Sequence, residues 1–85
     1  MPPGAVISVY IKDLATALEY YLKLVAIDPD YVGTYYHLGK LYEEEEDLEK
    51  ALVAYADGIV IAKKIKDQHA LSELMNAKMN LEMEM

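Results

Sequence analysis

The stretch that decides the fold runs Tyr35-Tyr36-His37-Leu38-Gly39-Lys40-Leu41-Tyr42, and Ala51 and Tyr55 follow it. Its apolar residues recur three and four positions apart, which is the spacing of one face of an α-helix. Gly39 lies beside Leu38 inside this pattern. Because the periodicity continues beyond Gly39, we interpret this glycine as a point where a second helix approaches closely, and not as a helix break. Ala51 is predicted to be the small residue that faces it.

The chain repeats part of its own sequence at a displacement of 34 residues. Asp13, Leu14, Ala17, Leu18, Tyr21 and Ile27 align with Asp47, Leu48, Ala51, Leu52, Tyr55 and Ile61. The matching residues lie at helical spacing, so the repeat predicts two equivalent helices, one over 13–27 and one from Asp47 onward. A short carboxylate at a helix start accepts hydrogen bonds from backbone N–H groups that have no partner within the helix. Asp13 and Asp47 are therefore predicted to be N-caps.

Two further helices are predicted between and after these copies. Pro29 cannot continue the first helix, and Asp30 can cap a helix over roughly 31–45. Asp67 can cap a last helix, which has a mostly apolar face. That face consists of Ala70, Leu71, Leu74, Ala77, Lys78 and Leu81. Residues 1–12 begin with helix breakers and continue with β-branched residues, so they can form either a stunted helix or an extended arm.

These residues together resemble the tetratricopeptide repeat (TPR) family, whose period is 34 residues. The resemblance covers residues 13–82. The residues at the motif positions of the family are Ala17, Tyr21, Pro29, Tyr35, Leu38, Gly39, Tyr42, Ala51 and Tyr55. It implies an all-α fold of antiparallel helix pairs, a fragment of an α-solenoid. We expect a single domain over 1–85, with an arm or stunted helix (1–12), a partial repeat (13–30), a full repeat (31–65) and a C-terminal capping helix (66–82).

The resemblance also implies a function, which is binding of a peptide or partner protein on the concave surface formed by the first helices of the repeats. The positions that the family uses for this are Gly33, Tyr36, Lys40, Glu43 and Glu44 in this sequence. Lys40 alone matches the basic clamp with which some family members hold a C-terminal carboxylate. A surface built around Tyr36 and Lys40 is better suited to a mixed apolar and polar peptide.

An alternative is that the chain assembles with itself. Repeat arrays usually need about three units for stability, and this chain has fewer than two repeats and a cap. A second copy could cover the open side of the incomplete first repeat. The sequence therefore leaves two expectations open, a partner protein of unknown identity and a homodimer or other homo-oligomer.

Composition excludes several other classes of function. The 85 residues carry 15 acidic side chains and 8 basic ones, a net charge of −7, and every base is lysine. Such a chain is a poor nucleic-acid binder, because contacts to phosphates need positive charge. It has no Cys, no apolar run near the ~20 residues of a membrane span and no signal-peptide pattern, so we expect a cytoplasmic protein.

No motif predicts catalysis, a cofactor or a metal site. The sequence has no P-loop, dinucleotide fingerprint or nucleophile elbow, so we expect a protein that is not an enzyme. His37 and His69 lack ligand spacing, and the acidic run 43–47 is interpreted as a solvated helix end. Met75 and Met79 could form an adaptable binding face. We interpret them instead as residues of the core or of the cap.

Overall fold

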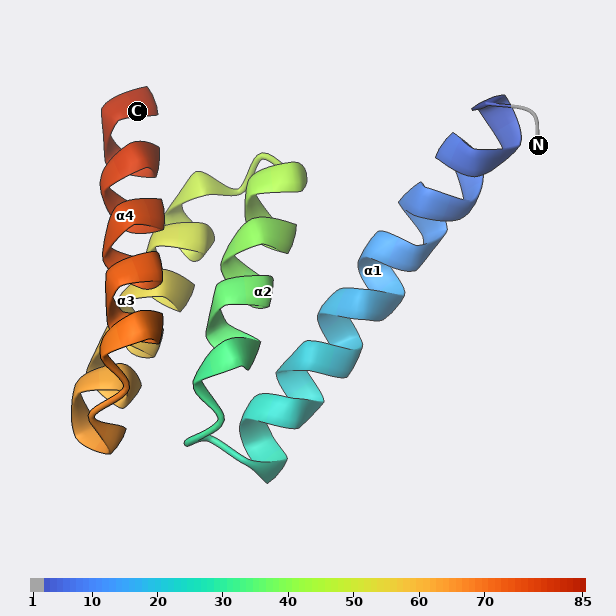
Figure 1. Ribbon diagram of the computed structural model, residues 1–85. Coiled ribbons are helices and arrows are strands. Elements are labelled where there is room, and N and C mark those ends of the chain that lie inside the picture. Colours follow the sequence, from blue (N-terminus) through green and yellow to red (C-terminus); the bar gives the residue numbers. More distant parts are fainter. Residues whose placement is uncertain (1–2) are drawn as a thin grey trace.

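The computed structural model describes residues 3–85, with side chains from residue 14 onward, and it contains four helices. They are α1 (Pro3–Ile27), α2 (Val32–Glu44), α3 (Leu48–Ile65) and α4 (Gln68–Glu84). Figure 1 shows α2, α3 and α4 packed side by side, whereas α1 diverges from α2 toward its N-terminal end. The described residues form no strand, and the predicted all-α fold of antiparallel helices is confirmed.

The core lies where α2 and α4 both pack against α3 and also contact each other, and small residues make this approach possible. Ala51 and Tyr55 of α3 are fully buried. A Cβ atom on Gly39 would lie 2.2 Å from the Tyr55 ring, so the predicted close contact is confirmed. A Cβ atom on Gly58 would lie 2.7 Å from the Cβ of Tyr35. Both glycines are thus required by interhelical distance and not by backbone conformation.

The last helix covers the open side of α3 as predicted. Leu74, Ala77 and Leu81 of α4 are buried against the core, and Leu74 reaches Gly58 of α3. The helix begins at Gln68 and continues to Glu84, beyond the predicted end at residue 82. Burying this apolar stripe removes it from water, which is the main stabilising contribution of a terminal helix in a repeat array.

Two of the four predicted N-caps are confirmed. The carboxylate of Asp47 accepts a hydrogen bond from the Lys50 backbone N–H at 3.3 Å, and that of Asp67 accepts one from Ala70 at 3.0 Å. The turn before α3 passes through Glu46, whose φ is 62°. This left-handed conformation lets the chain reverse so that α3 returns antiparallel to α2.

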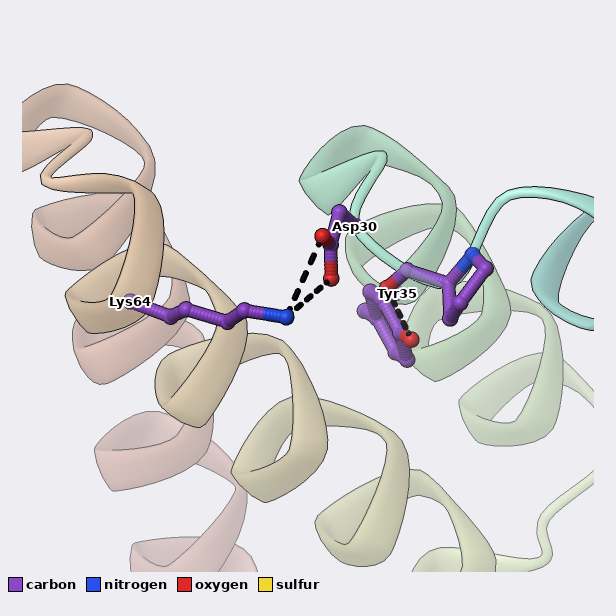
Figure 2. Close-up of polar contacts among 4 residues, drawn as sticks. Asp30, Tyr35 and Lys64 are labelled. Carbon is purple, nitrogen blue, oxygen red and sulfur yellow. Dashed lines mark hydrogen bonds and ion pairs between the residues drawn. The ribbon is translucent and has the colours of Figure 1, made fainter.

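The predicted cap at Asp30 is wrong. The N-cap of α2 is Tyr31, which makes no side-chain cap hydrogen bond. The Asp30 carboxylate instead binds the Lys64 ammonium of α3, with N···O distances of 3.0 and 3.2 Å (Figure 2). In the same view the Tyr35 hydroxyl donates a hydrogen bond of 2.5 Å to the carbonyl of Pro29. These contacts connect the α1–α2 loop to α3 through Lys64 and to α2 through Tyr35.

The predicted start of the first helix at Asp13 is also wrong. The helix α1 is continuous from Pro3 to Ile27, so Asp13 lies inside it and is not an N-cap. Residues 3–12 are therefore neither an extended arm nor a separate short helix. Because α1 does not turn near residue 12, its first half runs away from α2 (Figure 1).

Candidate partner-binding surface

The five residues predicted to contact a partner all lie on α2, whose other face is buried. Tyr35, Leu38 and Gly39 of α2 face α3 and its neighbours. Lys40 and Glu44 are exposed, whereas Gly33, Tyr36 and Glu43 are partly buried. We call the set Gly33, Tyr36, Lys40, Glu43 and Glu44 the α2 ridge. None of its five members is fully buried.

Tyr36 is at the centre of the α2 ridge and connects it to the core. Its ring packs against the core cluster, with its centroid 6.2 Å from that of Tyr55. The Lys40 ammonium lies 5.5 Å from the Tyr36 centroid, within the range of a cation–π interaction. The His37 ring contacts Tyr36 edge-on at 6.2 Å. Tyr36 is therefore held in place by Tyr55 of the core and by Lys40 and His37 of its own helix, and it is in part a structural residue.

Glu43 of the α2 ridge has an internal hydrogen bond. Its Oε2 accepts a hydrogen bond from the hydroxyl of Tyr55 and lies 3.9 Å from Nζ of Lys40. Burial raises the pKa of Tyr55 above its usual value, and the hydrogen bond to Glu43 raises it further. Glu43 thus holds the hydroxyl of a buried tyrosine, and Lys40 and Glu44 are the exposed charges of the ridge.

A hollow lies between α1 and α2, at the end of the ridge that carries Gly33. Its volume is about 490 Å³. We call it the α1–α2 hollow; among its lining residues are Tyr21, Leu24 and Ile27 of α1, the N-cap residue Tyr31, and Gly33 and His37 of α2. The rings of Tyr21 and His37 stack at 5.3 Å with an interplanar angle of 19°. The sequence singled out Gly33 but gave no binding role to the others, which belong to different helices.

The two methionines that we expected to pack in the core or in the cap lie on the capping helix α4 but outside the core. Met75 is 51% exposed and Met79 53%, and both line a groove of about 600 Å³ between α3 and α4. Their interpretation as core residues is wrong, because the stripe Leu74, Ala77 and Leu81 already fills the buried side of α4. Helical spacing alone cannot separate an apolar residue on the buried stripe from one beside it.

The two histidines lie apart from each other's contacts among the side chains of residues 14–85. His37 stacks on Tyr21, while Nε2 of His69 lies 3.2 Å from a carboxylate oxygen of Glu73 on α4. Among the described side chains, no three His, Cys, Asp or Glu residues are grouped so that they could hold a metal ion.

Comparison with known proteins agrees with this geometry. A TPR repeat model matches residues 9–45, and a tetratricopeptide repeat model matches residues 32–64. The chain is 45% identical to a tetratricopeptide repeat domain protein from Salinibacter ruber, known from a solution NMR structure and a crystal structure. The chain belongs to the TPR family. Among curated proteins, none matches it.

The similarity to the Salinibacter ruber TPR structures extends over nearly the whole chain. The NMR structure has a TM-score of 0.81, and the alignment covers 92% of this chain and 81% of that one. For the crystal structure the TM-score is 0.79, with 92% and 88% covered. TPR repeats serve generally as protein-interaction modules, so the family supports a surface for another protein. No helix among residues 3–85 is long and apolar enough to cross a membrane.

The two TPR matches overlap on α2, and their bounds show how the helices pair into repeats. The first combines most of α1, from residue 9 onward, with α2, and the second combines α2 with α3. The α2 ridge thus belongs to the helix that both matches share. Within this TPR register, α1 and α3 occupy equivalent positions, as the identities at Ala17/Ala51 and Tyr21/Tyr55 require.

Proposed function

We propose that this TPR chain is a non-enzymatic module that binds a peptide or partner protein along the α2 ridge. The observation that carries the proposal is the environment of Tyr36. Its ring is fixed by the core on one side and lies beside Lys40 on the other, 5.5 Å from the ammonium. A fixed aromatic surface costs little conformational entropy when a ligand binds, which favours such residues at binding sites.

The chemistry of the α2 ridge suggests the kind of partner. Lys40 offers a positive charge and Glu44 a negative one, and the partly buried ring of Tyr36 offers an aromatic surface. The α1–α2 hollow at the Gly33 end adds aromatic and apolar surface. A short amphipathic segment with both apolar and charged residues would complement this combination, as in helix-in-groove recognition.

The test compares two charge-neutral double variants. Lys40→Ala with Glu44→Ala removes the two exposed charges of the ridge and replaces no core residue. Lys63→Ala with Glu84→Ala removes one cation and one anion from exposed positions of α3 and α4. A partner captured by the native chain is identified by mass spectrometry, and its affinity for each variant is measured by titration calorimetry.

We expect the ridge variant to lose at least about tenfold in affinity, equivalent to about 1.4 kcal/mol, and the control variant to bind like the native chain. Equal affinities for the native chain and the ridge variant would contradict the proposal. Circular dichroism melting of both variants shows whether the fold is unchanged.

Homo-oligomerisation is a second candidate, favoured by the state of α1. Among residues 14–27, no side chain of α1 is buried, and Tyr20, Leu22 and Ile27 are exposed by 58%, 49% and 79%. A second copy could cover this helix. Analytical ultracentrifugation at micromolar concentration tests the idea, and a single monomeric species would contradict it.

A further inference from the structure

Equivalent residues of the two repeats differ in how well they are covered. Ala51 and Tyr55 of α3 have no exposed surface, whereas Ala17 and Tyr21 of α1 remain partly exposed. The residue types are identical, so the difference comes from the neighbouring helices. The helix α3 is packed between α2 and α4, while among the described helices α1 packs against α2 only. One neighbour of α1 is therefore missing.

The α1–α2 hollow is the place of the missing helix. In the full repeat, α2 lies over Tyr55 and contacts it at Gly39. The equivalent of Tyr55 in α1 is Tyr21, and Tyr21 lines the hollow. A helix in this position would contact Tyr21 and Leu24 on one side and His37 on the other. With such a helix, α1 would have two neighbouring helices, as α3 has.

The repeat register indicates which segment of the chain belongs there. Residues 3–12 are equivalent to residues 37–46, the second half of α2 and the start of the turn to α3. At Glu46 the chain reverses, with a φ of 62°, and so α2 lies back on α3. At the equivalent Lys12 the helix α1 continues without a turn. Residues 3–12 are directed away from α2 and cannot fill the hollow of their own chain in this conformation (Figure 1).

Charge favours a second copy of the chain as the occupant. The helix α1 carries Lys12, Asp13, Glu19 and Lys23, so it has no net charge, and the whole charge of −7 belongs to residues 28–85. An interface on another face would bring negative surfaces together, which is unfavourable. An interface along α1 avoids this repulsion. Residues 5–11 are also apolar apart from Ser8, which suits a helix that is buried by a partner.

We propose that two copies of this chain exchange residues 3–12. The first half of α1 from each protomer occupies the α1–α2 hollow of its partner, and the two hollows are related by a twofold axis. Such exchange of an identical element is a low-cost route to a dimer. The inference rests on homo-oligomerisation, the second candidate function above, and it specifies which surfaces meet.

Disulfide trapping tests the exchange, because the native chain has no cysteine. Ala5 is the equivalent of Gly39, and Tyr21 is the equivalent of Tyr55, so Ala5→Cys and Tyr21→Cys should meet in the exchanged dimer. Within one straight α1 these positions are about 24 Å apart, too far for a disulfide. The matched control combines Ala5→Cys with Val60→Cys, on an exposed part of α3. The readout is the mass of the oxidised protein on a non-reducing gel.

Each result of the trapping experiment has a distinct meaning. We expect a covalent dimer from the Ala5→Cys/Tyr21→Cys variant and none from the control. A covalent bond within one chain would overturn the exchange, because it would show that residues 3–12 fold back on their own α1. A chain that sediments as a dimer but forms no disulfide would also overturn the exchange, while homo-oligomerisation would stand. A monomer without a disulfide would contradict both.

A second variant guards against a loss of folding caused by replacing Tyr21. Lys12→Pro interrupts α1 at the position equivalent to the turn of the full repeat, since proline disfavours an interior helical position. If the exchange needs a straight α1, sedimentation equilibrium should show at least a tenfold weaker dimer for this variant. An unchanged dimerisation constant would overturn the proposal.

Discussion

At the scale of single residues, Gly33 and Gly39 of α2 have different surroundings. A Cβ atom on Gly39 would lie 2.2 Å from the ring of Tyr55, which is fully buried and cannot move away. A Cβ atom on Gly33 would lie 2.9 Å from the ring of Tyr31, but Tyr31 is 63% exposed and free to turn outward. The same substitution should therefore have opposite consequences at the two positions.

We predict that Gly39→Ala lowers the free energy of unfolding by about 2 kcal/mol or more, because overpacking forces α2 away from α3. Gly33→Ala should be neutral or stabilise by up to about 1 kcal/mol, since alanine has the higher helix propensity. Urea denaturation followed by circular dichroism measures both. Equal effects of the two substitutions would mean that the spacing between α2 and α3 adjusts easily.

At the scale of secondary-structure elements, the helix starts depend on different kinds of contact. The carboxylate of Asp67 caps α4 by accepting a hydrogen bond from the backbone N–H of Ala70, three residues later, which an aspartate at this position can do in any sequence. Asp30 instead forms an ion pair with Lys64, which is distant in the sequence. A sequence pattern predicts the local contact at Asp67. It cannot predict the contact at Asp30, because that depends on where α3 ends in space.

These two carboxylates give a matched pair of substitutions. Asp67→Ala should destabilise the protein by about 1 kcal/mol, because an N–H group at the start of α4 loses its acceptor. Asp30→Ala removes the same charge but only an exposed ion pair, and exposed pairs contribute between 0 and about 1 kcal/mol. Thermal melting at low and high salt distinguishes the two, since salt should diminish the effect of Asp30→Ala more than that of Asp67→Ala, whose hydrogen bond persists. Equal, salt-dependent effects would contradict the assignment of Asp67 as a cap.

At the scale of the whole molecule, the sequence predicted the α2–α3–α4 unit but not the course of α1. The periodicity around Leu38, Tyr55 and Leu74 determines which faces meet, so those helices could be identified from sequence alone. The repeat implied a turn near Asp13 as well. No residue there compels a turn, and Glu46 adopts its left-handed conformation in the full repeat without being glycine. The turn is therefore set by packing of α2 on α3, which a local pattern does not contain.

The proposed binding surface could be derived from the sequence only in part, for a related reason. Residues that the family pattern leaves free, such as Lys40 and Glu44, could be named from α2 alone. The α1–α2 hollow is formed by two helices together, and the stacking of Tyr21 on His37 depends on the angle between them. The groove beside Met75 likewise depends on how α4 lies on α3.

The stability of the whole molecule should fall in alkaline solution, because two tyrosines hold α2 in place. Burial is the main cause that raises the pKa of both Tyr35 and Tyr55 above 10.0, and neighbouring acidic groups raise it further. Below pH 10 the folded and unfolded states both keep these protons, so the contribution is complete. Above pH 10 the unfolded chain releases them first, and each tyrosine can then cost up to about 1.4 kcal/mol per pH unit until its folded pKa is reached.

Tyr55→Phe isolates the larger of these contributions. The variant keeps the buried ring but loses the hydrogen bond to Glu43, so we expect a loss of about 1 kcal/mol between pH 7 and 9. Above pH 10 the native chain should lose stability more steeply than the variant, and the difference between them should shrink. Urea denaturation at intervals from pH 8 to 11 measures both curves. Curves that stay parallel over this range would show that the Tyr55 hydroxyl titrates in the folded protein as it does in the unfolded chain.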